Sequence, residues 1–527
     1  MSVIDLLLFL SLLTLLTAAE KEKRYYRAAV VEHVRFGDYT HTKEQILETN
    51  LKTYETATQI AADNGADIIV LPEFGIFLPN KENRSWVKNF AEDVPDPKEE
   101  LSNPCSQSDM FEDRPILKQL SCLAYRNRIY LVANLVDTKK CSNRGSCDAT
   151  GITSCAESYS FCPEDEVLMY NTNVVFDRQG TLIARYHKRH LYFELDLNHP
   201  VDPKDIYFET DFGTFTTFIC FDMIFKESVE AVEKSGVVNV AYPTYWYDTA
   251  PFIYLAHAYQ QAWAVRNQVN LLAANAHNPS SGTMGSGIYS GSHGALIYSH
   301  SPDWRSKILI SNVPKFIEPK LPENLDTKIF SIDGDNSVEI TEQNVDIKQA
   351  SCIVGVPGPI KTGVKEYNCF QMDSSMYEYM KLKDAEGFLK NCMDDFCCEL
   401  SYKANSMEEN YYLGVYSGDF TGMQTFSLGT EACILARCDS TNDVACSNFK
   451  TKSSTVFQYV NIQGSFTSKH VYPTAVDSNT RLTDKKQWYF NGKSQIIYSN
   501  LNQNSSLIFL GLYGRHYNRD KIPIMNY

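Results

Sequence analysis

Residues 213 to 243 read GTFTTFICFDMIFKESVEAVEKSGVVNVAYP. An apolar run up to residue 225 precedes a predicted helix at 226–235, and the apolar run VVNVAYP follows that helix. A strand, a helix and a second strand in succession predict a layered α/β architecture. Apolar residues are nearly continuous along both runs, which is typical of a sheet that is covered on both faces.

The same alternation extends on both sides of this stretch. Apolar runs predict further strands at 26–34, 67–71, 129–136 and 269–275. Helical spacing of apolar residues predicts helices at 43–63, 114–127 and 252–267. The segment NTNVVFDRQGTLIARYHK, residues 171 to 188, predicts a hairpin, because two apolar runs flank a turn at 177–180.

The length and composition of the chain predict two domains. At 527 residues the chain is longer than one hydrophobic core supports. A Pro-rich polar stretch at 316–328 predicts a linker between an α/β domain at 20–315 and a second domain at 329–527. Short alternating segments after the linker predict that the second domain is β-rich. A Cys-rich insertion at 138–166 is expected to be a surface excursion held by disulfides.

The charge and the N-terminus favour a secreted protein that does not bind nucleic acid. The formal net charge is -15 and no basic cluster is present, whereas phosphate binding requires a basic face. Residues 1–19 combine a short Leu-rich core with a Thr-Ala-Ala end, which predicts a signal peptide rather than a membrane span. The C-terminus lacks the hydrophobic tail of a GPI signal. Sequons at Asn83 and Asn504 predict glycosylation.

Cysteine parity isolates one thiol. Fifteen cysteines in a secreted chain are expected to be mostly paired, so at least one is left over. The predicted first domain holds seven cysteines and the second holds eight, so the unpaired one is expected in the first. Of those seven, only Cys220 ends an apolar strand. Cys220 is therefore the expected free thiol.

A free Cys220 is either a small core residue or a nucleophile. A nucleophilic thiol needs a base, and a nearby cation stabilises the developing charge. Glu73 follows the strand DIIVLP and is a candidate base, although it could equally cap a helix. Lys188 follows the strand TLIARY and is a candidate oxyanion partner, although it could be a solvated lysine at a strand end. The surroundings of Cys220 do not fit a papain-like protease.

The order and context of these three residues resemble a known family. LPEF at 71–74, YHK at 186–188 and CFD at 220–222 are similar to the Glu, Lys and Cys motifs of the nitrilase (carbon–nitrogen hydrolase) superfamily. The segments AYPTYW, QAWAVRNQVNLLAANAH and GSGIY further resemble its vanin and biotinidase branch. That resemblance implies a four-layer α-β-β-α nitrilase sandwich followed by a β-rich C-terminal domain of the vanin type.

The resemblance also implies a mechanism without a metal or an organic cofactor. Glu73 would act as the general base, Lys188 as the cation at the oxyanion and Cys220 as the nucleophile of a thioester mechanism. The backbone N–H of Phe221 is expected to assist at the oxyanion. The likeness implies a small linear amide as substrate: pantetheine, hydrolysed to pantothenate and cysteamine. Hydrolysis of biotinyl amides such as biocytin, or a catalytically silent secreted binding glycoprotein, are the alternatives.

Further residues near these motifs are weaker candidates. Glu194 is expected to orient Lys188, and Tyr245 and Trp246 are expected to flank the substrate, although aromatic residues after strands more often serve packing. The residue types that commonly bind metal ions are found here at His187, His190, Glu194 and His199. Their spacing aligns ligands only on a helix, whereas an extended chain is expected here, so no metal site is predicted.

Overall fold

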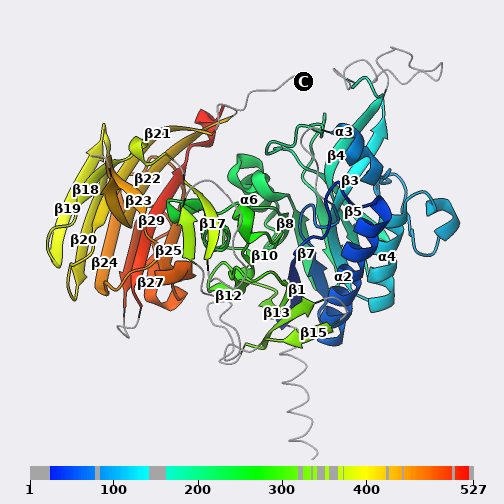
Figure 1. Ribbon diagram of the computed structural model, residues 1–527, viewed down its shortest axis with the longest axis horizontal. Helices are drawn as coiled ribbons and strands as arrows, with labels where there is room; N and C mark the ends of the chain where they lie inside the picture. The colour runs from blue at the N-terminus through cyan, green and yellow to red at the C-terminus, as the bar shows by residue number, and fades with distance from the viewer. Residues whose placement is uncertain are drawn as a thin grey trace, which may run out of the picture.

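The computed structural model describes residues 24–77, 83–141, 162–317, 325–333, 336–340, 351–354, 366–371, 373–422, 426–441, 444–500 and 505–521. Two domains lie side by side along the long axis of the molecule (Figure 1). Residues 1–19, the predicted signal peptide, and the predicted glycosylation site Asn504 fall outside the described residues. No helix within the described ranges is long and apolar enough to cross a membrane.

The first sheet of the N-terminal domain has parallel strands at its centre. Its order is β15-β14-β13-β1-β2-β3-β4-β5, in which β1 pairs in parallel with β2 and β2 with β3. These strands are β1 (Tyr25–Glu32), β2 (Ile68–Val70), β3 (Tyr130–Lys140), β4 (Val167–Phe176), β5 (Leu182–His187), β13 (Ser306–Pro314), β14 (Thr327–Asp333) and β15 (Asn336–Glu339). The predicted hairpin of residues 171–188 is the antiparallel pair β4 and β5.

A second sheet packs face to face on the first. Its order is β12-β11-β10-β8-β7-β6, and β7, β8 and β10 are parallel. The strands are β6 (Tyr207–Thr210), β7 (Gly213–Thr217), β8 (Asn239–Thr244), β10 (Asn270–Asn275), β11 (Ser286–Ser290) and β12 (Gly294–Ser299). Val30, Val70 and Val132 of the first sheet meet Ala241 and Leu272 of the second in one buried cluster.

Helices cover the outer faces of both sheets. α2 (Lys43–Asp63) and α4 (Pro115–Asn127) pack on the first sheet, with the short α3 (Arg84–Phe90) beside them. α6 (Lys226–Ser235) and α7 (Ala256–Asn267) pack on the second. The predicted four-layer α-β-β-α sandwich is confirmed. A capping box at Thr42 begins α2, as its Thr-x-x-Gln sequence favours.

The C-terminal domain is a β-sandwich. One sheet has the order β18-β21-β22-β29-β25-β26, with β23 beside β22, and the other has the order β19-β20-β24-β28-β27. The strands are β18 (Glu378–Lys381), β19 (Glu386–Met393), β20 (Phe396–Ala404), β21 (Tyr411–Gly422), β22 (Phe426–Thr441), β23 (Val444–Phe449), β24 (Phe457–Gly464), β25 (His470–Asp477), β26 (Arg481–Leu482), β27 (Trp488–Phe490), β28 (Gln495–Ser499) and β29 (Leu507–Arg515). The two sheets enclose an apolar core of their own, so the predicted β-rich second domain is confirmed.

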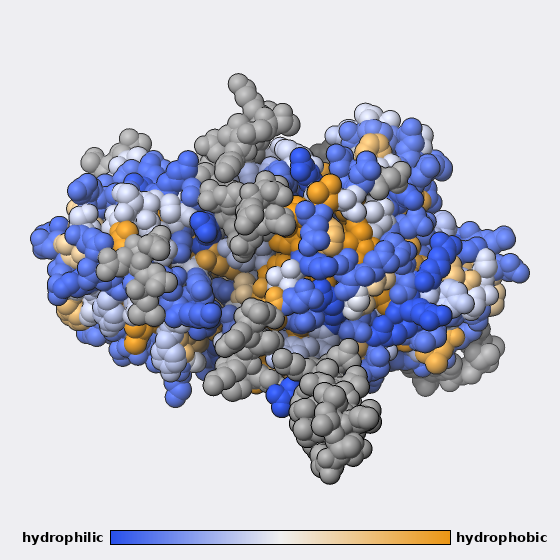
Figure 2. Space-filling model, turned by 90° about the horizontal axis from the view of Figure 1, so that it is seen from below, coloured by the Kyte–Doolittle hydropathy of each residue, from blue (hydrophilic) through white to orange (hydrophobic). Residues whose placement is uncertain are grey.

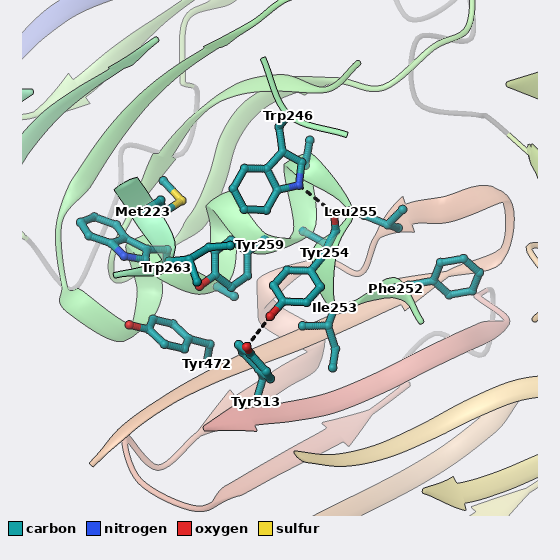
Figure 3. Packing of buried hydrophobic residues seen from close by; sticks show 14 of the residues in the cluster. Met223, Trp246, Phe252, Ile253, Tyr254, Leu255, Tyr259, Trp263, Tyr472 and Tyr513 are labelled. Carbon is teal, nitrogen blue, oxygen red and sulfur yellow. Dashed lines mark hydrogen bonds between the residues drawn. The ribbon is translucent and has the colours of Figure 1, made fainter. Parts of the chain in front are cut away.

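The two domains share a hydrophobic interior. α7 is buried on nearly all sides, because it lies between the second sheet and the C-terminal sheet that contains β25 and β29. Tyr259 and Trp263 of α7 pack in one cluster with Tyr472 and Tyr513 of the C-terminal domain (Figure 3). Seen from below, the surface is hydrophilic over both ends of the molecule, and hydrophobic residues gather toward its middle (Figure 2).

The segment that connects the two domains is arranged differently from the predicted linker. β14 and β15, at the end of the predicted linker and just after it, extend the first sheet of the N-terminal domain instead of opening the second domain. β14 pairs with β13 and β15 pairs with β14, which satisfies backbone groups at that edge. Conversely, β9 (Thr249–Ala250) of the N-terminal domain pairs with β17 (Glu366–Gln371), and β16 (Ser351–Val354) lies on the other side of β17.

The described cysteines agree with the parity prediction. Cys220 is the free cysteine among the residues that the structure describes. Disulfides join Cys105 to Cys122, Cys141 to Cys162, Cys392 to Cys397, Cys398 to Cys433, and Cys438 to Cys446. Most of the Cys-rich insertion, including Cys147 and Cys155, falls outside the described ranges.

Candidate active site

The candidate site lies where parallel strands of both sheets end. Glu73 follows β2 of the first sheet, while Cys220 and Tyr245 follow β7 and β8 of the second. Carboxyl ends of parallel strands meet at one edge of a sheet, and two packed sheets bring two such edges together. Glu73, Lys188, Glu194, Cys220 and Tyr245 consequently line one small cavity.

Glu73 is a buried carboxylate with one partnered oxygen. Its side chain is 1% exposed, and its Oε1 accepts hydrogen bonds from Lys188 Nζ and Asn171 Nδ2, both at 2.7 Å. Its Oε2 is buried and has no hydrogen-bond partner among the described residues. Burial raises the pKa of Glu73 and outweighs the opposing effect of Lys188. A carboxylate with a raised pKa and a free oxygen is suited to accept a proton.

Lys188 lies between two carboxylates. It follows β5 directly, and its Nζ forms ion pairs with Glu73 Oε1 and Glu194 Oε1. Burial alone would lower the pKa of Lys188, but the charges of Glu194 and Glu73 raise it well above its ordinary value. Lys188 is therefore a fixed cation. The contact with Glu194 is the one that the sequence led us to expect.

Cys220 begins a short turn instead of ending a strand. β7 ends at Thr217, and Cys220 is the first residue of the 3-10 helix Cys220–Ile224. Its φ of 45° lies in the left-handed region, which a non-glycine residue rarely adopts. The prediction that Cys220 ends a strand is wrong in this respect, because apolar patterning does not register a sharp change of backbone direction. Strained backbone of this kind is common at functional sites.

The surroundings of Cys220 keep it a thiol at rest. Its side chain is 5% exposed, and burial, followed by the charge of Glu73, raises the pKa of Cys220 well above its ordinary value. Lys188, the Thr244 hydroxyl and the backbone N–H of Tyr245 act in the opposite direction. Attack by Cys220 therefore requires a base that removes the proton during the reaction.

Asp222 fixes the turn that carries Cys220, a role that sequence reasoning missed. Its carboxylate accepts hydrogen bonds from Tyr186 Oη at 2.9 Å, from His190 N at 2.8 Å and from Ile219 N at 3.1 Å. Asp222 is buried, so these donors offset the cost of burying its charge. An acidic residue two positions after a buried cysteine was the available signal.

The other predicted residues have different surroundings. Trp246 is buried, donates its Nε1 proton to Tyr254 O at 2.9 Å and stacks on Tyr259 (Figure 3). Tyr245 lies at the cavity, with the guanidinium of Arg35 over its ring. Phe221 packs against Phe426 of the C-terminal domain. Asn83 is exposed at the start of α3.

The three histidines considered as metal ligands in the sequence contact separate partners. His187 contacts Asp137, His190 contacts Glu227, and His199 contacts the backbone oxygen of Arg189. Within the described residues, no group of three potential ligands has the arrangement of a metal site.

Comparison with known proteins assigns the family. Residues 28–313 match the family described as carbon-nitrogen hydrolase. The chain belongs to the carbon–nitrogen hydrolase family. Residues 368–520 match the vanin C-terminal domain, which confirms the resemblance to the vanin and biotinidase branch.

Relatives of this carbon–nitrogen hydrolase extend over nearly its whole length. Pantetheinase from Mus musculus is 31% identical over 480 residues, which covers 90% of this chain and 84% of that protein. Pantetheinase from Homo sapiens shows the same identity and coverage. Biotinidase from Homo sapiens is 32% identical over 535 residues, with 95% of this chain and 91% of that protein covered. The chain is a hydrolase of carbon–nitrogen bonds in amides other than peptides.

The C-terminal domain of this hydrolase forms one wall of a larger cavity beside the candidate site. This cavity has a volume of about 450 Å³, and Cys220, Tyr192 and Tyr247 line both it and the smaller cavity. The N-terminal domain contributes mainly aromatic residues to the larger cavity. The C-terminal domain contributes Phe370, Gln371, Asp373, Met376, Asp419, Phe420, Thr421, Phe426 and Leu428. Substrate specificity is thus open to influence from both domains.

Proposed function

We propose that this protein hydrolyses pantetheine to pantothenate and cysteamine through a thioester on Cys220. The observation that carries the proposal is the free, buried thiol of Cys220 beside the fixed cation Lys188 and the partly unpartnered carboxylate of Glu73. The pantetheinases of mouse and man, which match 90% of the chain, support pantetheine as the substrate.

In the proposed mechanism Glu73 acts twice. Its carboxylate takes the thiol proton as Sγ of Cys220 attacks the amide carbonyl carbon, and the carbonyl electrons move to oxygen. Lys188 and the backbone N–H of Phe221 stabilise that oxyanion. When the oxyanion collapses, the C–N bond breaks and Glu73 protonates the departing amine. Water then attacks the thioester carbonyl carbon while Glu73 takes its proton, the C–S bond breaks to release the acid, and Glu73 returns the proton to Sγ of Cys220.

The mainly aromatic lining of the larger cavity favours an uncharged substrate. Its volume of about 450 Å³ lies in the range common for small-molecule sites. The described residues that line it include Asp373 and Asp419 but no lysine or arginine. Pantetheine carries no charge at neutral pH, whereas the lysine portion of biocytin carries both an ammonium and a carboxylate, which are costly to bury in a cavity lined mainly by aromatic side chains. The disulfides of both domains further support action in an oxidising compartment outside the cytosol.

The purified full chain tests this assignment with two substrates. We expect release of cysteamine from pantetheine with a kcat/KM at least about 10-fold above that for release of lysine from biocytin, which corresponds to the net contribution of one hydrogen bond. The reverse preference would assign the biotinidase activity. Hydrolysis of neither substrate, nor of other linear amides, would favour the silent binding glycoprotein.

Phe426 tests the contribution of the C-terminal wall. Its ring packs 5.1 Å from the ring of Phe221, next to the nucleophile. We expect Phe426→Ala to raise KM about 10-fold and to change kcat little, because it removes apolar contact with bound substrate but leaves the reacting groups in place. Phe388→Ala is the control, since Phe388 lies exposed in the same domain and outside the cavity. Equal KM values for Phe426→Ala and wild type would exclude a role of this wall in binding.

A further inference from the structure

Three buried asparagines connect the segments that carry the catalytic residues. Asn134 lies on β3, and Asn171 and Asn173 lie on β4, all three at most 1% exposed. Asn134 is opposite Asn173 in the strand register. Val132, two residues before Asn134, belongs to the apolar layer between the sheets, so Asn134 faces the same layer. The apolar layer is therefore bordered by amide groups at the edge of the two sheets where the candidate site lies.

Asn171 contacts three residues of the candidate site. Its Nδ2 donates to Glu73 Oε1 at 2.7 Å and to Glu194 Oε2 at 2.8 Å. Its backbone oxygen accepts a hydrogen bond from Lys188 N at 2.8 Å. Lys188 Nζ and Asn171 Nδ2 thus both occupy Oε1 of Glu73, which leaves Oε2 available for proton transfer.

Asn134 determines which way the Asn171 amide points. Its Oδ1 accepts a hydrogen bond from Phe74 N at 3.0 Å, so its other end, Nδ2, is a donor. That Nδ2 donates to Asn171 Oδ1 at 2.7 Å. Because Asn171 Oδ1 is occupied as an acceptor, only its Nδ2 can face the two carboxylates. The backbone N–H next to Glu73 thereby sets the orientation of the group that holds the Glu73 side chain.

Asn173 extends the same connection to the nucleophile. Its Nδ2 donates to Thr217 Oγ1 at 2.8 Å, and Thr217 is the last residue of β7, three positions before Cys220. The same hydroxyl donates to Ala241 O of β8 at 2.8 Å. The asparagines therefore join the Glu73 segment, the Lys188 segment and the Cys220 segment across the two sheets.

We propose that Asn171, oriented by Asn134, is a positioning residue that holds Glu73 and Glu194 around Lys188 so that Oε2 of Glu73 serves as the catalytic oxygen. This inference rests on the proposed thioester mechanism but not on the identity of the amide. A purely structural role, in which the amides only satisfy buried polar groups, is the alternative. The two differ in their effect on the ionisation of the site.

The isosteric substitution Asn171→Asp distinguishes the two roles. It exchanges the N–H donors for a carboxylate beside Glu73 and Glu194, and like charges raise the pKa values of acidic groups. We expect the acid limb of the kcat/KM profile to move up by about one pH unit. Alkylation of Cys220 by iodoacetamide at a given pH should be about 10-fold slower, since one pKa unit changes the thiolate fraction 10-fold. At the pH optimum of the variant, kcat should fall about 100-fold, because a misplacement of catalytic groups by about 1 Å has an effect of that size.

Asn270→Asp is the matched control. Asn270 is also a buried strand asparagine of the paired sheets, and its Nδ2 donates to Asn239 Oδ1 at 3.0 Å and to Pro314 O at 2.7 Å. We expect this variant to lose thermal stability but to keep both pH profiles of wild type. If Asn171→Asp also loses stability while kcat at its own pH optimum stays that of wild type, Asn171 has only a structural role and the proposal is wrong.

Asn134→Asp provides a second route if Asn171→Asp does not fold. It keeps the acceptor for Phe74 N and removes the donor that orients Asn171, so a smaller shift of both profiles in the same direction is expected. Unchanged profiles in this variant would overturn the proposal. The alkylation measurement needs no substrate. A shifted alkylation profile in a protein that does not hydrolyse pantetheine would therefore reject the proposed substrate and retain the positioning role.

Discussion

Cys220→Ala is expected to lower kcat/KM for amide hydrolysis at least about 10⁴-fold, because it removes the nucleophile of the thioester mechanism. The fold should persist, since alanine is also small and apolar and Cys220 forms no disulfide. Measurement of cysteamine release together with thermal unfolding separates the two effects.

Alkylation without reduction gives a second readout for the same variant. We expect wild-type protein to gain one label, on Cys220, and the variant to gain none, because Cys220 is the free cysteine of the described chain. Serine is a useful comparison, since its hydroxyl fits the site but its much higher pKa makes it a poor nucleophile here. A variant without Cys220 that retains full activity would refute the mechanism.

Lys188→Met is expected to impair both activity and stability. Loss of the oxyanion partner should lower kcat by about 10²–10³-fold. Removal of the cation leaves the carboxylates of Glu73 and Glu194 buried without their counter-ion, which typically costs about 3–5 kcal/mol of unfolding free energy. Thermal or denaturant unfolding measures the second effect.

The stability loss of Lys188→Met should depend on pH. The pKa of Glu73 is already raised above its unfolded value by burial, and loss of the cation raises it further. The folded variant then binds more protons than the unfolded chain, so its stability falls as pH rises and recovers toward acid pH. Lys307→Met is the control, because Lys307 is equally buried, pairs with Glu32 and Asp303, and lines neither cavity of the site. It should destabilise the fold but leave kcat of the folded protein unchanged.

The sequence was sufficient to predict the layers of the fold and the main candidate residues. Apolar runs such as VVNVAYP stand out because both faces of a central strand are buried. Glu73, Lys188 and Cys220 were singled out because each follows such a run and because LPEF, YHK and CFD resemble the motifs of the carbon–nitrogen hydrolases. Cys220 was also distinguished by parity, which is independent of its neighbours.

Features that depend on distant contacts were not predicted. β14 and β15 extend the first sheet although they lie in and after a polar Pro-rich segment, because β14 pairs with β13 and β15 pairs with β14, which local composition does not indicate. Asn134 and Asn171 resemble ordinary polar residues within strands, and their role emerges only when β3, β4 and the Glu73 segment come together. The wall formed by Phe420 and Phe426 likewise exists only once the two domains are packed.

The burial of Cys220 also has a redox consequence. Thiol–disulfide exchange requires a thiolate, and a thiol with a strongly raised pKa forms little of it. Cys220 can therefore share a chain with disulfides such as Cys105–Cys122 and Cys398–Cys433 without attacking them. The same low thiolate population slows oxidation to a sulfenic acid, which also proceeds from the thiolate. In the proposed mechanism the thiol is activated only when substrate is bound, which would keep it reduced in an oxidising environment.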